Sequence, residues 1–508
     1  MIAIRGLAGA GKTTMMREAV PAIEAGGHKV FTFAPSAESS RGTLREEGFS
    51  NAQTVAHLLK NESLHPQLCG QVLWIDEAGL LSARQMRGIF QLAERQDCRV
   101  ILSGDTRQHT SVERGDALRL LETYAGLKPA ELTEIRRQKD AQYREAVKEF
   151  ASDNPQGGFA KLDQMGVIKE LPVEERYKQL AYDYADAVAY RKSVLVVSPT
   201  HAEGEKVTAL IREELKQRGN LGADERKFTR VVNQQWTEAQ LSHAPNYRLG
   251  LVVQFHQNAP GFTRGQRVTV LEIKDEAVWT KDERGRELKL PLEQSGRFQV
   301  YESHTIALAP KDKIRITQNG FAADGKHRLN NGAVYQVKGF TKDGDLKLSN
   351  GWVIGKDYGN LAHGYCQTSH VAQSKTVDCV FVAQSMESFG ASSTEQFFVS
   401  ISRARESVTI YTDDKARLAE AIQSSGARMS AHELLKLPVV TKITDPFESM
   451  LREKAVIPAL EKVAQGSKSE KEKDIAKKRQ VESRRARQWL GPVHQAQNAH
   501  QQRRGISL

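Results

Sequence analysis

The 508-residue sequence has little cysteine, no long apolar run and no internal repeat with a period of about 20–50 residues. Its four cysteines are isolated and none forms a Cys-x-x-Cys pair, so neither a zinc site nor a disulfide framework is indicated. No stretch of about 18 apolar residues occurs, which argues against a membrane span. The short apolar N-terminus leads directly into a glycine-rich segment and does not match a signal peptide. Isolated thiols without a targeting segment predict a cytoplasmic protein.

Positive charge is in excess, but it is unevenly spread. The formal net charge is +11, and residues 451–508 hold 14 Lys and Arg against 6 Asp and Glu. Residues 465–508 have almost no large apolar side chains, so we expect a basic tail that is disordered or helical. Such a tail can bind DNA, RNA or an acidic surface. A solvated tail without a partner and a protein-docking helix within 481–490 are the alternatives.

Short apolar runs alternate with amphipathic stretches over the first 140 residues, which predicts a parallel sheet covered on both faces. These runs are Ile2–Arg5, Val30–Ala34, Val72–Ile75 and Val100–Ser103. A charged stretch that reads as helical, at about 141–190, precedes a second α/β unit. The strands of that unit are predicted at Val194–Val197, Asp378–Ala383 and Val408–Thr412. The predicted fold class is therefore α/β.

Residues 225–360 differ, because many short strand-like runs are broken there by turn signals such as Asp343–Gly344. Two segments resemble small β-barrels, Gly265–Val300 and Asp312–Ile354. We predict a small SH3-like β-barrel insertion within the second α/β domain. The predicted divisions are a first α/β domain, linker helices with the start of the second domain, the insertion, the rest of the second domain, and an extension that carries the tail: 1–150, 151–224, 225–360, 361–425 and 426–508.

A complete phosphate-binding pattern, G-x-x-x-x-G-K-[ST], lies at residues 6–13 between an apolar strand and a stretch that reads as helical. The glycines let backbone N–H groups wrap the phosphates, and the helix N-terminus adds partial positive charge. Lys12 is predicted to neutralise the β- and γ-phosphates, and Thr13 to hold Mg²⁺. The alternative is a chance glycine-rich turn. The predicted nucleotide-binding residues are Gly6, Gly9, Gly11, Lys12, Thr13 and Thr14.

Polar groups end two of the predicted strands. Asp76 and Glu77 follow Val72–Ile75, and we predict that Asp76 binds Mg²⁺ and that Glu77 polarises the attacking water. The alternative is a surface acid pair, which the preceding phosphate-binding pattern disfavours. Gln108 follows Val100–Ser103 and is predicted to sense the γ-phosphate.

The order of the motifs resembles the RecD-like branch of the superfamily-1 helicases over about residues 1–415. The ordered set is more specific than any single motif. Besides the segments above, the likeness rests on Ala34-Pro-Ser-Ala, Thr54-Val-Ala-His57-Leu-Leu, Leu132-Thr-Glu-Ile-Arg136-Arg137-Gln138, Val196-Val-Ser-Pro199-Thr200, Gly364-Tyr-Cys-Gln-Thr368-Ser-His370-Val-Ala-Gln373 and Phe397-Phe-Val-Ser-Ile-Ser402-Arg403-Ala-Arg405.

The resemblance implies two RecA-like motor domains with ATP and Mg²⁺ between them. It implies that Arg137 and Arg403 are arginine fingers at the γ-phosphate, a role that suits planar guanidinium groups. Surface ion pairs are the alternative for both, and Arg136 is the expected bystander. The resemblance also implies contacts with a DNA strand, from Pro35, Ser36, Thr54, His57, Thr200, Thr368, His370 and Gln373.

Within this family the chain most resembles the helicase portion of conjugative relaxases of the MobF class. No His-x-His pattern occurs, so the relaxase's metal site is not represented, and a relaxase domain or conjugation proteins are the expected protein partners. The family's adenine-contacting segment before the glycine loop is missing, so we expect weak selectivity for the base of the nucleotide. We also expect that the chain is a fragment or comes from a split or truncated gene. Ser374 stands where the family has Gly, and altered coupling to the strand is expected.

The sequence therefore predicts an ATP-dependent DNA helicase that acts on single-stranded and duplex DNA, with a 5′→3′ direction by family likeness. Two alternatives stay open: a translocase that does not separate strands, and an inactive DNA-binding fragment of a larger relaxase. Four aromatic residues near the expected strand path could stack on bases, but core packing or an ordinary exposed ring is favoured for each, and none is assigned to DNA binding: Tyr247, Phe255, Phe262 and Tyr365.

Overall fold

The computed structural model describes residues 1–430 and 433. Nearly all of the predicted extension 426–508, including the whole predicted basic tail, lies outside the described residues. Within the described part of the chain, no helix combines the length and the apolar character that crossing a membrane requires.

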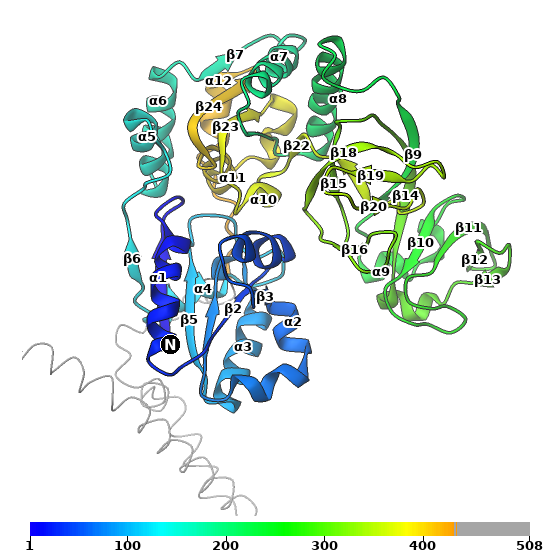
Figure 1. The fold of residues 1–508 in the computed structure, drawn as a ribbon, viewed down its shortest axis with the longest axis horizontal. Helices are drawn as coiled ribbons and strands as arrows, with labels where there is room; N and C mark the ends of the chain where they lie inside the picture. Colours follow the sequence, from blue (N-terminus) through cyan, green and yellow to red (C-terminus); the bar gives the residue numbers. More distant parts are fainter. Residues whose placement is uncertain (431–432, 434–508) are drawn as a thin grey trace, which may run out of the picture. The chain divides into compact units, whose positions relative to one another are not determined.

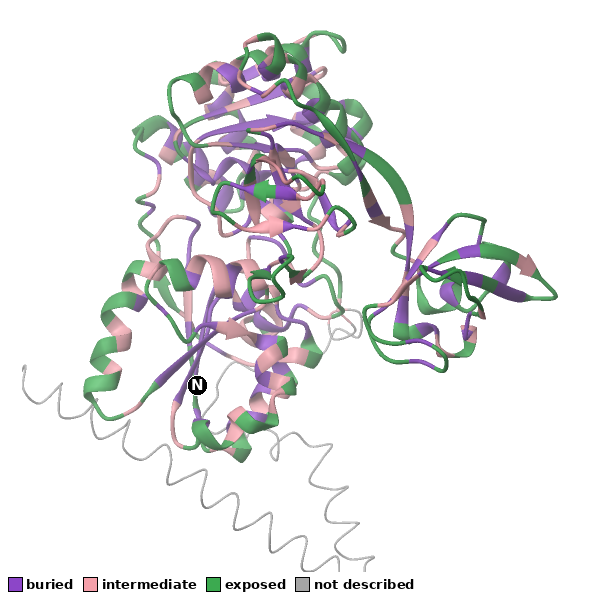
Figure 2. Ribbon diagram, turned by 45° about the vertical axis from the view of Figure 1, so that its right-hand side comes forward, coloured by how far each residue is buried: buried purple, intermediate pink, exposed green. Residues whose placement is uncertain are grey.

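The first sheet has six strands, all paired in parallel, in the order β3-β2-β4-β5-β1-β6. Its strands are β1 (Ile2–Gly6), β2 (Val30–Ala34), β3 (Gln53–Thr54), β4 (Val72–Ile75), β5 (Arg99–Gly104) and β6 (Ala130–Leu132). β2 and β4 are buried along their whole length (Figure 2), as expected for a parallel sheet covered on both faces. The predicted parallel sheet and the four strands predicted here are confirmed.

Helices flank this sheet (Figure 1). Met16 of the first helix packs with Trp74 of β4 in one apolar cluster. α3 begins after Ser82 because a capping box forms there, in which Ser82 and Gln85 each accept a hydrogen bond from the other's backbone N–H. The elements are α1 (Lys12–Ala25), η1 (Glu38–Leu44), α2 (Val55–Lys60), η2 (Glu62–Leu68), η3 (Ala78–Leu80), α3 (Ala83–Arg95) and α4 (Ala117–Tyr124).

The second sheet is also parallel throughout, in the order β22-β8-β23-β24-β7. Its strands are β7 (Ile168–Glu170), β8 (Val194–Val197), β22 (Cys366–Gln367), β23 (Val377–Ala383) and β24 (Ala404–Thr412). The three predicted strands are confirmed. The stretch predicted to be helical at about 141–190 is mostly helical, but it also contains β7, because a three-residue edge strand is too short to show a period in the sequence.

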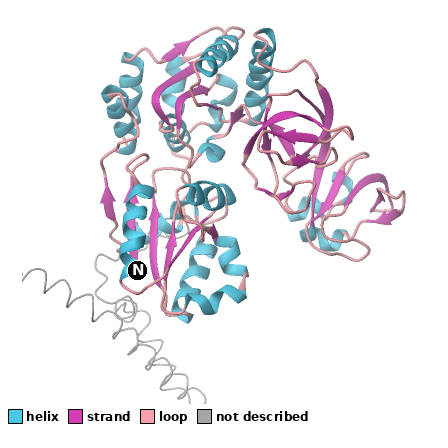
Figure 3. Ribbon diagram, viewed as in Figure 1, coloured by secondary structure: helices cyan, strands magenta, loops and turns pink. Residues whose placement is uncertain are grey.

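Successive residues of β23 face opposite sides of this sheet and enter two different apolar clusters. Val380 and Val382 join the cluster of α5 and α11, whereas Phe381 and Ala383 join the cluster of α7 and α8. Helices therefore cover both faces, as in the first sheet (Figure 3). They are α5 (Ala141–Ala151), α6 (Pro155–Gln164), α7 (Arg176–Ala189), α8 (His201–Gln217), α10 (Ser369–Ala372), η6 (Met386–Ala391), α11 (Thr394–Ile401) and α12 (Lys415–Ala421).

Between α8 and β22 the chain forms two antiparallel sheets, ordered β13-β12-β11-β10-β14-β9 and β20-β19-β18-β15-β21, and the hairpin β16-β17. Each sheet includes strands outside the two predicted barrel segments, namely β9 and β10 in the first and β21 in the second. The SH3-like description stays a prediction. The elements are β9 (Arg226–Asn233), α9 (Glu238–Leu241), η4 (Ala244–Asn246), β10 (Val252–Phe255), β11 (Arg267–Lys274), β12 (Ala277–Asp282), β13 (Glu287–Lys289), η5 (Leu292–Arg297), β14 (Phe298–Leu308), β15 (Lys313–Ile316), β16 (Gly320–Phe321), β17 (Arg328–Leu329), β18 (Val334–Phe340), β19 (Leu346–Leu348), β20 (Val353–Ile354) and β21 (Leu361–His363).

The four aromatic residues considered for base stacking are buried. Tyr247, Phe255 and Phe262 belong to the core of the first antiparallel sheet. The Tyr365 hydroxyl donates a hydrogen bond to the carboxylate of Asp312 at 2.7 Å. Of the two ordinary roles considered for these rings, core packing is therefore the one that the structure shows.

Candidate functional site

The glycine loop connects β1 to α1 and turns through two left-handed residues, Gly9 (φ 84°) and Gly11 (φ 85°). A Cβ atom on Gly9 would lie 2.6 Å from the Cβ atom of Arg137, so only glycine fits there. Gly6 leaves room for the Lys12 side chain, whose Nζ donates to the Gly6 carbonyl oxygen at 2.7 Å. The loop thus presents backbone N–H groups and an ammonium at the N-terminus of α1, a site suited to an anion.

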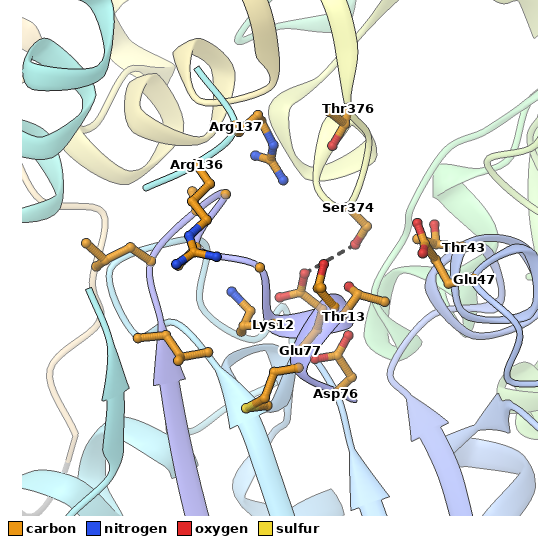
Figure 4. Close-up of a pocket in the computed structure, with 18 of the residues that line it drawn as sticks. Lys12, Thr13, Thr43, Glu47, Asp76, Glu77, Arg136, Arg137, Ser374 and Thr376 are labelled. Carbon is orange, nitrogen blue, oxygen red and sulfur yellow. Dashed lines mark hydrogen bonds between the residues drawn. The ribbon is translucent and has the colours of Figure 1, made fainter. Parts of the chain in front are cut away.

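A cavity of about 1210 Å³ opens beside this loop (Figure 4). Residues from the segments that form the first and the second parallel sheet, here called the two parallel-sheet parts, line this cavity. They include Arg137 from the first part and Arg403 from the second. Gly6 is the one predicted nucleotide-site residue that does not line this cavity. The predicted residues along its wall are Gly9, Gly11, Lys12, Thr13, Thr14, Asp76, Glu77, Gln108, Arg137 and Arg403.

Asp76 lies buried at the end of β4, where its Oδ1 accepts a hydrogen bond from the Ser103 hydroxyl at 2.8 Å. Ser103 in turn accepts from Trp74 Nε1 at 2.9 Å. Burial and the neighbouring Glu77 raise the pKa of Asp76 to about 6, and a cation beside this carboxylate would lower it again. Among the described residues, no cluster of three or more His, Cys, Asp or Glu forms a protein-only metal cage. One carboxylate and the Thr13 hydroxyl fit Mg²⁺, which retains several waters and takes further oxygen ligands from substrate phosphates.

Glu77 adopts a left-handed backbone conformation (φ 53°) that directs its carboxylate toward residues after α10. It accepts a hydrogen bond from Gln373 Nε2 at 3.4 Å. It accepts another from the Ser374 hydroxyl, also at 3.4 Å (Figure 4). Ser374 is itself left-handed (φ 69°), and its hydroxyl lies 3.2 Å from the Ser39 hydroxyl. Gln373, a predicted strand-contacting residue, therefore reaches the predicted hydrolysis site.

The two predicted finger arginines and Gln108 lie on neighbouring walls of the cavity. Arg137 donates to the Ser402 carbonyl oxygen at 2.7 Å, and Arg403 Nη2 donates to Gln108 Oε1 at 3.4 Å. Gln108 is also bonded to Asp105 at 3.0 Å. Burial and the charge of Arg403 lower the pKa of Arg137 to about 9, and burial lowers the pKa of Arg403. Two desolvated cations held this close would be stabilised by an anion in the cavity.

The predicted strand-contacting hydroxyls occupy helix starts and turns. Ser36 accepts from the N–H of Ser39 at 2.9 Å, Thr54 caps α2 at 3.1 Å, and Thr200 caps α8 at 3.3 Å. Thr200 and Thr368 line a second cavity, of about 310 Å³. Pro35, Ser36, Thr54 and His57 line neither of these two cavities, so the structure does not gather all eight predicted residues at one place.

His370, another of those eight, stacks on His109 with the ring centroids 3.6 Å apart. His109 also lies 2.9 Å from the Ser369 hydroxyl through Nε2. Burial lowers the pKa of both imidazoles, that of His109 to about 3, so both are neutral near pH 7. The pair joins the Gln108 loop to α10. The sequence reasoning missed His109, and its position next to Gln108 was the available signal.

Comparisons with known proteins bear on the same region. Residues 1–172 match the family model of an AAA domain. The conjugal transfer protein TraA of Rhizobium radiobacter is 29% identical over 222 residues, covering 43% of this chain and 20% of the relative. The multifunctional conjugation protein TraI of Escherichia coli (strain K12) is 22% identical over 501 aligned residues, covering 85% of this chain and 27% of the relative. The chain is similar in sequence to these conjugal transfer proteins over part of their length.

The resemblance inferred from the order of the motifs is thereby confirmed, although the chain spans only between 20% and 27% of the length of these two relatives. Among solved structures, Bacteroides Pif1 bound to single-stranded DNA is 16% identical, with a TM-score of 0.40 and coverage of 86% of this chain and 92% of the other. Pif1 helicase from Candida albicans is 14% identical, with a TM-score of 0.39 and coverage of 86% and 94%.

Proposed function

We propose that the chain is an ATP-dependent DNA helicase that moves 5′→3′ along a single strand. One observation carries the proposal: a phosphate-binding loop, an acid pair and two arginines from separate parallel-sheet parts line a single cavity. This arrangement suits phosphoryl transfer, in which catalysis consists mostly of positioning and charge stabilisation. The similarity to conjugal transfer proteins supports a role in moving DNA, with a relaxase domain or conjugation proteins as partners.

In the proposed cycle, Lys12 and the loop N–H groups bind the β- and γ-phosphates of ATP. Thr13 and Asp76 would hold Mg²⁺, which supplies charge neutralisation on the phosphate oxygens. Glu77 orients and polarises the attacking water, while Arg137 and Arg403 offset the charge that develops on the transferred group.

Strand binding and hydrolysis are linked in this proposal through residues around α10. Gln373 contacts Glu77, and His370 stacks on His109. A DNA strand that displaces α10 would therefore shift Glu77 and the loop that carries Gln108 together. The proposed strand contacts are the hydroxyls of Thr54, Thr200 and Thr368, assisted by Pro35, Ser36 and His57. Such contacts are made to the DNA backbone and carry no base sequence.

The proposed function predicts ATP turnover that single-stranded DNA stimulates. Lys12→Ala should lower that turnover by on the order of 10²–10³-fold, because it removes one electrostatic stabiliser of the phosphoryl group. The measurement is phosphate release with and without an oligonucleotide, followed by strand displacement on duplexes with either a 5′ or a 3′ single-stranded tail. Stimulation without displacement would favour a translocase. Absence of turnover would favour a DNA-binding fragment, and displacement only from 3′ tails would reverse the direction.

A second prediction concerns the hydrogen bond from Ser103 to Asp76. Ser103→Ala should raise the Mg²⁺ concentration that half-maximal turnover requires by roughly 10- to 100-fold, the usual contribution of a partner that orients a metal ligand. The measurement is ATPase rate across an Mg²⁺ titration. Ser103→Thr keeps the hydroxyl and serves as the control. An unchanged Mg²⁺ requirement in the alanine variant would argue against Asp76 as the metal ligand.

A further inference from the structure

The second cavity, of about 310 Å³, lies where α8 meets strands of the β insertion. Its walls come from the start of α8, from β9, β14, β15 and β21, and from residues 366–368. Thr200 and Thr368, two predicted strand-contacting residues, lie at this cavity. Three arginines also line it: Arg212, Arg230 and Arg315.

The three arginines differ in how their charge is balanced. Arg212 is neutralised, because it bonds both carboxylate oxygens of Asp312 at 2.9 and 2.8 Å and also pairs with Glu225. Arg230 pairs through Nη2 with one carboxylate, Glu205, while its Nε is buried without a hydrogen-bond partner.

Arg315 has no carboxylate partner at all among residues 1–430 and 433, and its Nε is also buried without a hydrogen bond. Burial and the nearby Arg230 lower its pKa, which reflects a guanidinium held in an unfavourable place. The two histidines of the wall add no charge at neutral pH, because burial lowers the pKa of both His201 and His363. The cavity therefore holds one cation without a counter-ion, Arg315, beside Arg230, which is paired with Glu205 but keeps a free Nε donor.

A partly buried charge without a counter-ion is stabilised when a ligand of opposite charge binds beside it. The flat guanidinium fork matches the oxygens of a phosphate. α8 begins at this cavity with Thr200 as its cap, and a helix N-terminus adds partial positive charge. No Phe, Tyr or Trp lines the cavity, so its chemistry favours a phosphate rather than a stacked base.

We propose that Arg315 and Arg230 bind one backbone phosphate of the single strand in this cavity, beside Thr200 and Thr368. This inference rests on the proposed function and extends it. The β insertion and the second parallel-sheet part would then both contact the same strand. The insertion and this part would therefore move along DNA as one unit.

The test compares Arg315→Gln with a matched control, Arg226→Gln. Arg226 is an exposed arginine of β9 that pairs with Asp224 and lies outside the cavity. Affinity for an oligo-dT and for a mixed-sequence strand is measured at several salt concentrations. Arg315→Gln should weaken binding roughly tenfold for both strands. It should also flatten the slope of log K against log salt by about 0.7, the value for one phosphate contact on a single strand.

Arg315→Lys keeps the charge without the fork, so it should keep the salt slope and lose part of the affinity. Affinity and slope in Arg315→Gln equal to those of Arg226→Gln would overturn the proposal.

If the wild-type chain binds no single strand, the proposed function fails by itself. The anion site is then tested by thermal unfolding in inorganic phosphate against chloride at equal ionic strength. A larger rise of Tm in the wild type than in Arg315→Gln supports a phosphate site, and equal rises overturn it.

Discussion

Glu77→Gln is expected to bind ATP with nearly unchanged Kd and to hydrolyse it about 10²–10⁴-fold more slowly, the usual contribution of a positioned general base. The amide keeps the shape of the side chain, and its oxygen can still accept a hydrogen bond from Gln373 or Ser374, both of which bond Glu77 at 3.4 Å. It cannot accept the proton of the attacking water. Phosphate release under saturating ATP, together with equilibrium ATP binding, measures the two effects separately.

Glu47→Gln is the matched control, because Glu47 is another glutamate that lines the same cavity (Figure 4). Unlike Glu77, it does not follow β4, and it pairs with Arg17 at 3.5 Å. It should retain nearly full turnover. Lys12→Ala should differ from both by losing ATP affinity as well as turnover. Wild-type hydrolysis in Glu77→Gln would remove Glu77 from the mechanism and leave only the phosphate-binding role of the cavity.

The parts of the site that the sequence predicts best come from short contiguous segments. The glycine loop and the acids after β4 each fit within a few residues of one strand end, so local pattern is enough to place them. Parallel strands end at the same sheet edge, which is why Asp76 lies near the loop although 64 residues separate it from Lys12.

Contacts between distant segments are what the sequence could not predict. Ser374 reaches Glu77 across 297 positions, and His109 reaches Ser369 across 260. Ser103 ends a predicted strand, and only the pairing of β4 with β5 shows that its hydroxyl faces Asp76. In each case the contact depends on tertiary packing, and the hydrophobic periodicity within a single segment gives no information about it.

The two adjacent arginines after β6 show the same limit. Residue type does not separate Arg136 from Arg137, and only family resemblance favoured the second. Both side chains line the cavity, but the structure separates them by their surroundings. The side chain of Arg136 is 72% exposed and pairs with Glu134, whereas Arg137 is more deeply placed and bonds the Ser402 carbonyl oxygen.

Arg137→Ala and Arg403→Ala are each expected to lower kcat by on the order of 10³–10⁵, the usual contribution of an arginine finger, with a much smaller change in Kd for ATP. The physical reason is that both guanidiniums are desolvated at the cavity, and the charge of Arg403 also lowers the pKa of Arg137, so an anion that gains charge in the transition state is stabilised by both. Lysine at either position keeps the charge but not the fork, and it should restore only a small part of the rate.

Arg136→Ala provides the control for this pair, because it removes a neighbouring guanidinium that is exposed and bound to Glu134. It should leave kcat nearly unchanged. Since Arg403 is almost fully buried, thermal unfolding of each variant must accompany the kinetics, and Arg403→Lys reports the role if Arg403→Ala fails to fold. A loss of ATP affinity with kcat intact would assign the affected arginine to ground-state binding. If only one of the two variants lost kcat, that arginine alone would stabilise the transition state, and the finger role proposed for the other would be wrong.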